Sequence, residues 1–347
     1  MTGTHLEVVE YMIRHLASLA LASLLAFSSV GCAGTDDPEI LDDVEEALAS
    51  AGSETPEALT AFPTIMLHGY GGSDSVMGFN NIARYLTKRG FVVSNPAVPP
   101  YNAPLRRAGF FAKAIDEMIK KTGAKKVNIV AHSSGGIDAR ILVTQLGYGD
   151  RIASITTIGT PHRGTLLADY SLKLYSKEHV EPAVKAIARW LGRRVTTEDL
   201  ANDEDLIAAI EALTESGAPE FNRANPNDER VYYQSWAGVS ARVGVGDSED
   251  MVVCERKLSG KTDKMNPLLT GWSLIVGHGL GIQDSFRPND GLSTVESAKW
   301  GNFRGCLRAD HVEEMGGLDG KMKENGSGFY APRFYEEMLV DLAKRGY

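Results

Sequence analysis

One serine lies in a turn whose residues suit nucleophilic catalysis. The apolar run at 127–130 leads directly into the sequence AHSSGG at 131–136, and a segment with helical periodicity follows at 137–146. A sharp turn between a buried strand and a helix lifts a hydroxyl above the edge of a sheet, and small residues on either side let strand and helix approach. We therefore predict Ser133 as a nucleophile; the alternative is a glycine-rich turn with an incidental serine.

A histidine must activate such a serine, because a hydroxyl is a weak nucleophile until a base takes its proton. In this arrangement the acid and then the histidine follow the serine along the chain. Of the eight histidines, only His311 follows both the last predicted strand and a candidate acid. We predict His311 as the base; the alternative is a surface histidine near the start of a helix. The other histidines considered come too early in the chain or lie inside the turn: His68, His132, His162 and His278.

Three aspartates are candidates for the acid that orients the histidine. Asp284, Asp290 and Asp310 all lie between the apolar run at 273–276 and His311. Asp290 stands in the sequence PNDG, which favours a tight turn that holds a carboxylate in place. Such a carboxylate sets the tautomer of the imidazole and stabilises the imidazolium. We predict Asp290 for this role, with Asp284 second; for either, the alternative is a simple turn former.

Acyl transfer also needs donors for the negatively charged oxygen of its tetrahedral intermediate. One is expected from the backbone N–H of the residue after the nucleophile, Ser134, and the other from a loop after an early strand. The sequence HGYGG at 68–72 directly follows the apolar run at 64–67. We predict that Tyr70 donates its N–H there. By itself this glycine-rich sequence indicates only a flexible turn.

A sheet whose strands end at one edge would bring these residues together. Short apolar runs alternate with segments of helical periodicity, which indicates an α/β fold with a mostly parallel sheet and helices on both faces. Ligands of such sheets bind beyond the carboxyl ends of the strands. The stretch 165–217 has no strand-like run, so we expect a helical insertion over the sheet. The predicted strands lie at 64–67, 91–93, 127–130, 154–158, 231–235 and 273–276, and the main helices at 76–89, 110–121 and 137–146.

The composition is that of an ordinary globular protein. The 347 residues include 36 Lys and Arg against 45 Asp and Glu, which gives a formal net charge of −9. No segment supplies the concentrated basic surface that nucleic acids require, so we expect no nucleic acid partner. The 36 glycines and 14 prolines follow no period, which excludes a collagen-like chain. The three cysteines lack the paired spacing of a zinc module.

The first 32 residues have the layout of an export signal. An uncharged run at 16–30 follows Arg14, and it is shorter than the about 20 residues that span a bilayer. The sequence SVGC at 29–32 resembles a bacterial lipobox, in which Cys32 becomes the acylated first residue, although Ser29 replaces the usual leucine. We expect an outer membrane lipoprotein or, as the alternative, a secreted protein. An acidic tether at 33–61 would then precede a catalytic domain at 62–347.

Two cysteines remain once Cys32 is removed by lipidation or cleavage. They are Cys254 and Cys306. Outside the cytoplasm such a pair is commonly oxidised. We therefore expect a disulfide between them; the alternative is two buried thiols that never meet.

Several segments together resemble the bacterial true lipases of family I. The resemblance covers 62–347, and the sequence TTIGTPHRG at 156–164 is its most specific part. It implies an α/β-hydrolase fold with a mobile helical lid, for which 165–217 is the candidate. It also implies hydrolysis of carboxylic esters, typically triacylglycerols at a lipid–water interface, and it leaves open a folding chaperone as a further partner. The matching segments are LHG at 67–69, AHSSGG at 131–136, SITTIGTPHRG at 154–164, YQSWAG at 233–238 and NDG at 289–291 before His311.

Two features depart from that family. The residue after the nucleophile is usually glutamine and is Ser134 here, which leaves its backbone donor unchanged. Members of the family hold a structural calcium with two aspartates, and the matching positions here are Asn266 and Glu313. Losing one carboxylate weakens a calcium site, although Asp263 would compensate if the loop were shifted. We therefore expect no required cofactor and leave a structural calcium open.

The sequence thus predicts a serine carboxylester hydrolase. Within this class we favour a triacylglycerol lipase that forms an acyl-enzyme on Ser133. A short-chain esterase, a polyester depolymerase or an acyltransferase would use the same three residues, because these specify acyl transfer and not the acyl group. The remote alternative is a non-catalytic lipid-binding lipoprotein that keeps the fold. The apolar residues of the insertion would cover the site in water or serve only in helix packing: Leu166, Leu167, Trp190 and Leu191.

Overall fold

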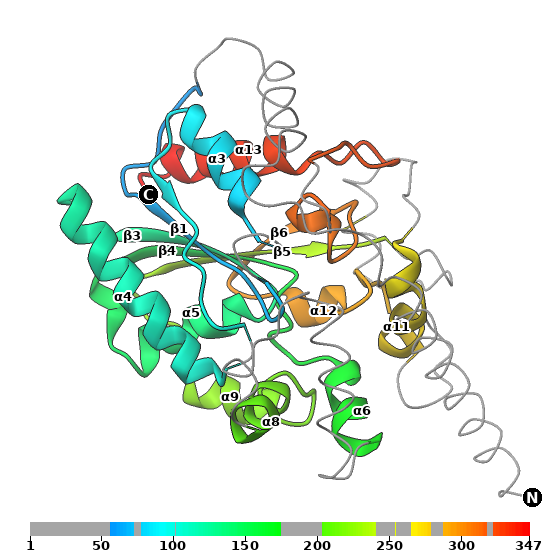
Figure 1. The fold of residues 1–347 in the computed structure, drawn as a ribbon. Coiled ribbons are helices and arrows are strands. Elements are labelled where there is room, and N and C mark those ends of the chain that lie inside the picture. The colour runs from blue at the N-terminus through cyan, green and yellow to red at the C-terminus, as the bar shows by residue number, and fades with distance from the viewer. Residues whose placement is uncertain are drawn as a thin grey trace, which may run out of the picture.

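A parallel sheet forms the centre of the structure, a computed structural model (Figure 1). All five pairings of neighbouring strands are parallel, in the order β2-β1-β3-β4-β5-β6. The strands are β1 (Thr64–Leu67), β2 (Val93–Ser94), β3 (Val127–His132), β4 (Ile152–Ile158), β5 (Tyr232–Gly238) and β6 (Asn302–Leu307). The structure describes residues 56–72, 78–100, 102–174, 203–240, 254, 265–278, 287–317 and 322–347.

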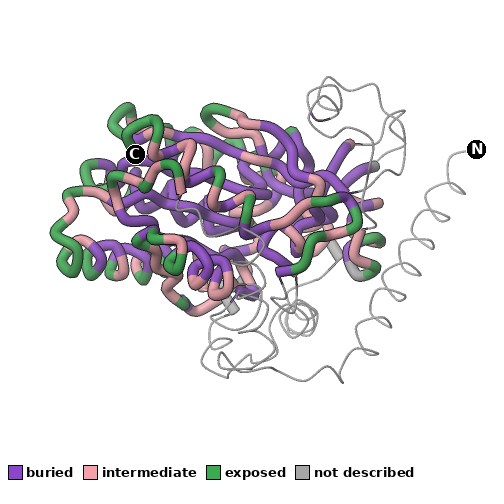
Figure 2. Tube along the Cα trace, turned by 90° about the horizontal axis from the view of Figure 1, so that it is seen from above, coloured by how far each residue is buried: buried purple, intermediate pink, exposed green. Residues whose placement is uncertain are grey.

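Helices cover both faces of this sheet, as predicted (Figure 1). Alternate side chains of a strand point to opposite faces. Ile65 and Leu67 of β1 therefore pack with α4 and α5, whereas Met66 packs with α3 and α13. The four helices are α3 (Asn80–Lys88), α4 (Pro104–Thr122), α5 (Gly135–Thr144) and α13 (Ala331–Lys344). Figure 2 shows the strands buried between these layers and the exposed positions on the outer turns of the helices.

The prediction of a strand at 273–276 is wrong. These residues belong to α11 (Pro267–His278). Leu269, Ser273 and Val276 are buried, and their spacing of four and three residues is that of one helix face. A short apolar run does not by itself distinguish a strand from part of a buried helix. The sixth strand is instead β6, whose alternating polar residues gave no apolar run in the sequence.

The insertion predicted at 165–217 contains two helices among its described residues, and residues 212–217 form turns. It contains α6 (Leu166–Leu174) and α8 (Asp203–Glu211), and α9 (Ala218–Ala224) follows it. Its two ends are joined by a hydrogen bond of 2.8 Å from the N–H of Thr165 to the carbonyl of Leu213. Leu166 is buried and Leu167 half-buried at the start of α6. Trp190 and Leu191 lie outside the described residues, as do Cys32 and residues 1–55.

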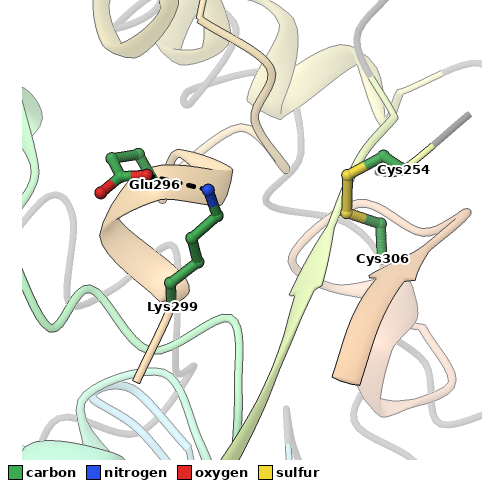
Figure 3. The surroundings of a disulfide bond; sticks show 4 residues. All are labelled: Cys254, Glu296, Lys299 and Cys306. Carbon is green, nitrogen blue, oxygen red and sulfur yellow. Dashed lines mark hydrogen bonds and ion pairs between the residues drawn. A yellow bond between two sulfur atoms is a disulfide. The ribbon is translucent and has the colours of Figure 1, made fainter. Parts of the chain in front are cut away.

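The predicted disulfide between Cys254 and Cys306 is confirmed (Figure 3). Cys306 lies in β6, and Cys254 is joined to it across 52 positions of the sequence. Beside the bridge, α12 (Val295–Ala298) carries Glu296, which pairs with Lys299 at 3.0 Å. The bridge therefore joins a distant part of the chain to the strand that leads to His311.

The end of the predicted tether lies against the C-terminus of the chain. The N–H of Ala61 donates to the carbonyl of Tyr347 at 2.8 Å, and Lys344 pairs with Glu57 at 2.6 Å. Within the described ranges, no helix combines the length and the apolar character needed to cross a bilayer.

Candidate active site

Ser133 lies in a strained turn between β3 and α5. Its φ of 55° is the only positive φ among the described non-glycine residues. Such a conformation persists only where the surrounding structure fixes it. Here the N–H of Ser133 donates to Ile158 at 3.0 Å, and the hydroxyl of Thr160 donates to the carbonyl of Ser133 at 2.7 Å. The end of β4 thus holds the turn that the sequence predicted.

Two glycines let the neighbouring backbone approach this turn. A Cβ at Gly135 would lie 2.5 Å from the carbonyl oxygen of Leu67 in β1. A Cβ at Gly69 would lie 2.6 Å from the Cβ of Ser133. Because the first of these neighbours is backbone, a side chain at position 135 would force strand and helix apart. Packing therefore requires a glycine at position 135.

Ser133, His311 and Asp290 form one continuous chain of hydrogen bonds. Nε2 of His311 lies 2.9 Å from Oγ of Ser133, and Nδ1 lies 2.8 Å from Oδ2 of Asp290. Both His311 and Asp290 are almost fully buried. A carboxylate only accepts hydrogen bonds, so Nδ1 carries the ring proton and Nε2 is left to accept the proton of the serine. The structure brings together the three residues that the sequence predicted.

The turn around Asp290 fixes its carboxylate. Oδ1 accepts the N–H groups of Leu292 at 2.8 Å and Ser293 at 2.6 Å, while Oδ2 faces His311. The N–H of His311 also donates to the carbonyl of Asp290 at 2.9 Å. The tight turn predicted from PNDG is thus present. Of the competing acids, Asp310 accepts backbone N–H groups instead, and Asp284 lies outside the described residues.

The predicted oxyanion loop lies against the turn of Ser133. The N–H of Tyr70 donates to Oγ of Ser134 at 2.9 Å, which places Tyr70 beside the residue predicted to supply the second donor. Ser134 is the residue at the N-terminal cap of α5. The positive end of the helix dipole therefore faces the region where negative charge develops in acyl transfer.

A buried arginine that sequence reasoning missed fixes the oxyanion loop. Arg107 of α4 is fully buried and pairs with Asp138 of α5 at 2.9 Å. Its Nη2 donates to the carbonyl of His68 at 2.6 Å, and its Nη1 donates to the carbonyl of Pro100 at 3.0 Å. One guanidinium thus joins the loop to the helix that follows Ser133. No motif in the sequence distinguishes Arg107 from the other basic residues of α4.

His68 has a structural role within the same loop. Its Nδ1–H donates to the carbonyl of Gly69 at 2.9 Å, and its Nε2 accepts the N–H of Val98 at 3.3 Å. Because Nε2 accepts, it carries no proton, and the ring is neutral. Burial, and then the positive charge of Arg107, lower the pKa of His68 to about 3. His68 is therefore neutral at physiological pH.

A second buried acid, Glu314, lies close to His311 and Asp290, and no motif in the sequence predicted it. Oε2 of Glu314 is 2.8 Å from Nε2 of His132. Burial and the neighbouring charge of Asp290 raise the pKa of Glu314 well above its ordinary value, whereas burial lowers the pKa of His132. Both groups are then neutral, and the carboxyl group of Glu314 donates to the ring. A Cβ at Gly159 or at Gly238 would overlap the carboxyl group of Glu314, so the ends of β4 and β5 leave room for it.

The sequence GTPHRG joins β4 to the segment that carries the acid. The guanidinium of Arg163 donates to the carbonyls of Glu296 and Lys299, each at 2.6 Å. The hydroxyl of Thr165 donates to the carbonyl of Leu292 at 2.6 Å, directly beside Asp290. This sequence therefore holds the acid turn against the base of the helical insertion. His162, from the same sequence, is buried and stacks on Trp300, away from the hydrogen-bonded chain.

At the calcium positions that the resemblance implies, the described carboxylates bond to N–H donors, and Asp263 lies outside the described residues. Oε2 of Glu313 accepts the N–H of Asp310 and the amide of Asn325, each at 3.0 Å. The carboxylate of Asp310 accepts the N–H of Asn266 at 2.7 Å. Calcium requires six to eight oxygen ligands that are free to face it, and here the carboxylate oxygens face N–H donors. Among the described residues, one group has the residue types and spacing of metal ligands: His132, His311 and Glu314. These side chains already bond to one another or to Ser133 and Asp290.

Comparisons with known proteins agree with this fold. Residues 63–234 match the family model described as the alpha/beta hydrolase fold. A triacylglycerol lipase of Vibrio cholerae is 28% identical over 323 residues, which are 87% of this chain and 91% of the relative. Triacylglycerol lipase 2 of Saccharomyces cerevisiae is 26% identical over 282 residues, 77% of this chain and 73% of the relative.

Solved structures with the same fold are more distant in sequence. A lipase of Bacillus licheniformis in its mature form superposes with a TM-score of 0.53 at 18% identity, covering 83% of this chain and 94% of that chain. A metagenomic carboxyl esterase superposes with a TM-score of 0.56 at 14% identity, covering 85% and 80%. At such identities the likeness establishes the fold alone. The family match and the parallel sheet show an α/β-hydrolase fold, and the lipase relatives support carboxylic ester hydrolase activity.

Proposed function

We propose that this chain is a triacylglycerol lipase that acts through an acyl-enzyme on Ser133. The observation that carries the proposal is the unbroken chain from Ser133 through His311 to Asp290, with bonds of 2.9 and 2.8 Å. The names of the relatives from Vibrio cholerae and Saccharomyces cerevisiae favour triacylglycerols over other esters. The long insertion after β4 agrees with a lipase, because it starts beside the acid turn.

The first half of the reaction would acylate the serine. Oγ of Ser133 attacks the carbonyl carbon of the ester while its proton passes to Nε2 of His311. The electron pair of the C=O bond moves onto oxygen, and the N–H of Ser134 and the loop of Tyr70 stabilise that charge. When the intermediate collapses, Nε2 returns the proton to the alcohol oxygen, which leaves. Asp290 holds the ring and stabilises the transient imidazolium.

The second half would release the acid by the same steps with water as the nucleophile. Water loses a proton to Nε2 of His311 and attacks the acyl carbon, and Oγ of Ser133 leaves with the proton that His311 returns. All proton transfers pass through His311. We therefore propose that the reaction requires no cofactor.

We also propose that the protein is exported and meets its substrate at a lipid surface. The support is the signal-like sequence with Cys32, which lies outside the described residues, and the disulfide between Cys254 and Cys306. Metabolic labelling with an alkyne fatty acid in a bacterial host tests the anchor. We expect label on the wild type and none on Cys32→Ser, whereas an unlabelled, exported wild type would indicate plain secretion.

Ester hydrolysis by the purified chain from residue 33 onward tests the proposed substrate class. Rates are measured with p-nitrophenyl esters from acetate to palmitate and with emulsified triolein, for the wild type and Ser133→Ala. We expect activity on long chains and triolein that is lost in the variant. Activity on short soluble esters alone would make the protein an esterase, and equal rates in both proteins would reject Ser133 as the nucleophile. Transfer to an added alcohol in preference to water would indicate an acyltransferase.

A further inference from the structure

Ser134 directly follows the proposed nucleophile, Ser133, but its hydroxyl does not cap the helix that begins there. Ser134 is the N-cap residue of α5, and its side chain makes no capping hydrogen bond to the helix. A capping serine normally accepts an N–H of the first helical turn. Here Oγ instead accepts the N–H of Tyr70, at 2.9 Å. The hydroxyl has been turned from the helix toward the oxyanion loop.

The proton of this hydroxyl has no acceptor among the residues that the structure describes. Ser134 is 1% exposed, and the bond from Tyr70 uses one lone pair of Oγ. A serine hydroxyl carries one proton of its own and donates it wherever an acceptor is within reach. A buried hydroxyl that accepts but does not donate forgoes one stabilising hydrogen bond. An oxygen that arrives with the substrate would supply the missing acceptor.

The surrounding contacts hold the hydroxyl in this position. Arg107 fixes the carbonyl of His68, and the N–H of Gly72 donates to the carbonyl of Gly69 at 3.2 Å, so Tyr70 lies in a closed turn. Gly69 packs directly on Ser133. The N–H of Tyr70 is therefore aimed at Ser134 by a loop that is bonded on both sides.

We propose that Oγ of Ser134 is a further catalytic group, which donates its proton in a hydrogen bond to the oxyanion of the tetrahedral intermediate. This role rests on the proposed function. The backbone N–H of Ser134 donates to the same oxygen, and the N–H of Tyr70 polarises the hydroxyl from behind. Hydrogen bonds in such a chain strengthen one another. No proton is transferred: the hydroxyl keeps its hydrogen while charge develops on the substrate oxygen and is lost again on collapse.

This arrangement changes the role expected for Tyr70. A single N–H that points at Oγ cannot point equally well at a second oxygen, since hydrogen bonds weaken steeply when bent. Tyr70 then acts on the oxyanion through Ser134. The other reading of the contact is that the hydroxyl blocks the N–H of Tyr70 and must leave before reaction. The two readings predict opposite effects of removing the hydroxyl.

Steady-state kinetics of Ser134→Ala separates them. The variant keeps the backbone N–H and loses only the hydroxyl. We expect kcat for p-nitrophenyl esters to fall about 10- to 100-fold, somewhat less than is typical for loss of one oxyanion donor, with KM within about twofold. A matched thionoester, whose sulfur is a poor hydrogen-bond acceptor, should lose much less. Ser134→Cys, which keeps a weak donor of similar shape, should fall between the wild type and Ser134→Ala.

Ser154→Ala is the matched control. It also removes a buried hydroxyl, one that donates to Asn128 at 2.7 Å near the opposite end of the sheet. We expect this variant to lower the melting temperature and leave kcat unchanged.

Three outcomes would overturn the role of Ser134. An unchanged or higher kcat in Ser134→Ala would show that the hydroxyl is dispensable or blocks the site. An equal loss on ester and thionoester, together with a lower melting temperature in both Ser134 variants, would show a structural role. If the wild type shows no hydrolysis that depends on Ser133, the proposed function itself is rejected. This result is distinguishable from the other two, because it is seen before any Ser134 variant is compared.

Discussion

Oε2 of Glu314 lies 3.7 Å from Nδ1 of His311, the same ring nitrogen that bonds to Asp290 at 2.8 Å. Two buried carboxyl groups thus meet at one side of the His311 ring. They do not both carry a charge there, because burial and the charge of Asp290 raise the pKa of Glu314 well above its ordinary value of 4.5. Glu314 is the protonated member of the pair.

This assignment predicts the effect of pH on Glu314→Gln. A carboxyl group whose pKa is raised in the folded state costs no stability at a pH below its pKa in the unfolded chain. As pH rises above that unfolded-state pKa, the group increasingly destabilises the folded state. The neutral amide avoids this penalty and still donates to His132. We expect the variant to become more stable relative to the wild type between pH 4.5 and pH 8, seen in urea titrations as a larger difference in the free energy of unfolding in favour of the variant. A constant difference across that range would show that Glu314 is ionised.

His68 predicts the opposite dependence on pH. Its folded pKa of about 3 lies below the ordinary 6.5, so the unfolded chain binds more protons between these values. The stability that this residue contributes is complete above pH 6.5 and falls as pH decreases, by about 1.4 kcal/mol per pH unit. His68→Gln, which does not titrate, should therefore lose less stability between pH 6.5 and pH 5 than the wild type does. Parallel curves for the two proteins in urea titrations would contradict the buried neutral ring.

Thr165 tests the connection between the insertion and the acid turn. Its hydroxyl donates to the carbonyl of Leu292, whose N–H in turn donates to Asp290. Thr165→Val removes the hydroxyl and keeps the shape. We expect a loss of about 1 kcal/mol in stability and a several-fold lower kcat with little change in KM, measured on p-nitrophenyl butyrate. Thr165→Ser should restore kcat; if it does not, the effect comes from packing of the methyl group.

The donors around Asp310 and Glu313 predict that calcium has no stabilising role. Their carboxylate oxygens accept N–H groups of Asn266, Asn325 and neighbouring backbone. We expect the melting temperature to be the same, within about 1 °C, in millimolar calcium and in EDTA. A clear rise with calcium would mean that these hydrogen bonds give way to a metal site.

The central residues of the site could be predicted because each lies in a short motif with a local physical cause. The residues of AHSSGG favour the end of a strand, a turn and the start of a helix, and the residues of PNDG favour the turn around Asp290. The order of serine, acid and histidine then left few choices, and the structure places all three in one chain of hydrogen bonds.

The residues that were missed act through contacts that only the fold creates. Arg107 and Glu314 are single charged residues in ordinary surroundings in the sequence, and both become fully buried when distant segments meet. The error at 273–276 has the same cause, because four apolar residues fit a strand as well as they fit one face of α11. The contact between Tyr70 and Ser134 joins residues 64 positions apart, and no local pattern could have shown which way the hydroxyl turns.

Covalent labelling shows directly whether Ser133 is the nucleophile. The wild type, Ser133→Ala and His311→Ala are incubated with a fluorophosphonate probe, and the modified peptide is identified by mass spectrometry. We expect one adduct on Ser133 in the wild type, none in Ser133→Ala, and labelling slowed about 10²-fold or more in His311→Ala, because the ring no longer takes the proton. An adduct on another residue, or equal labelling of the wild type and Ser133→Ala, would contradict Ser133 as the nucleophile.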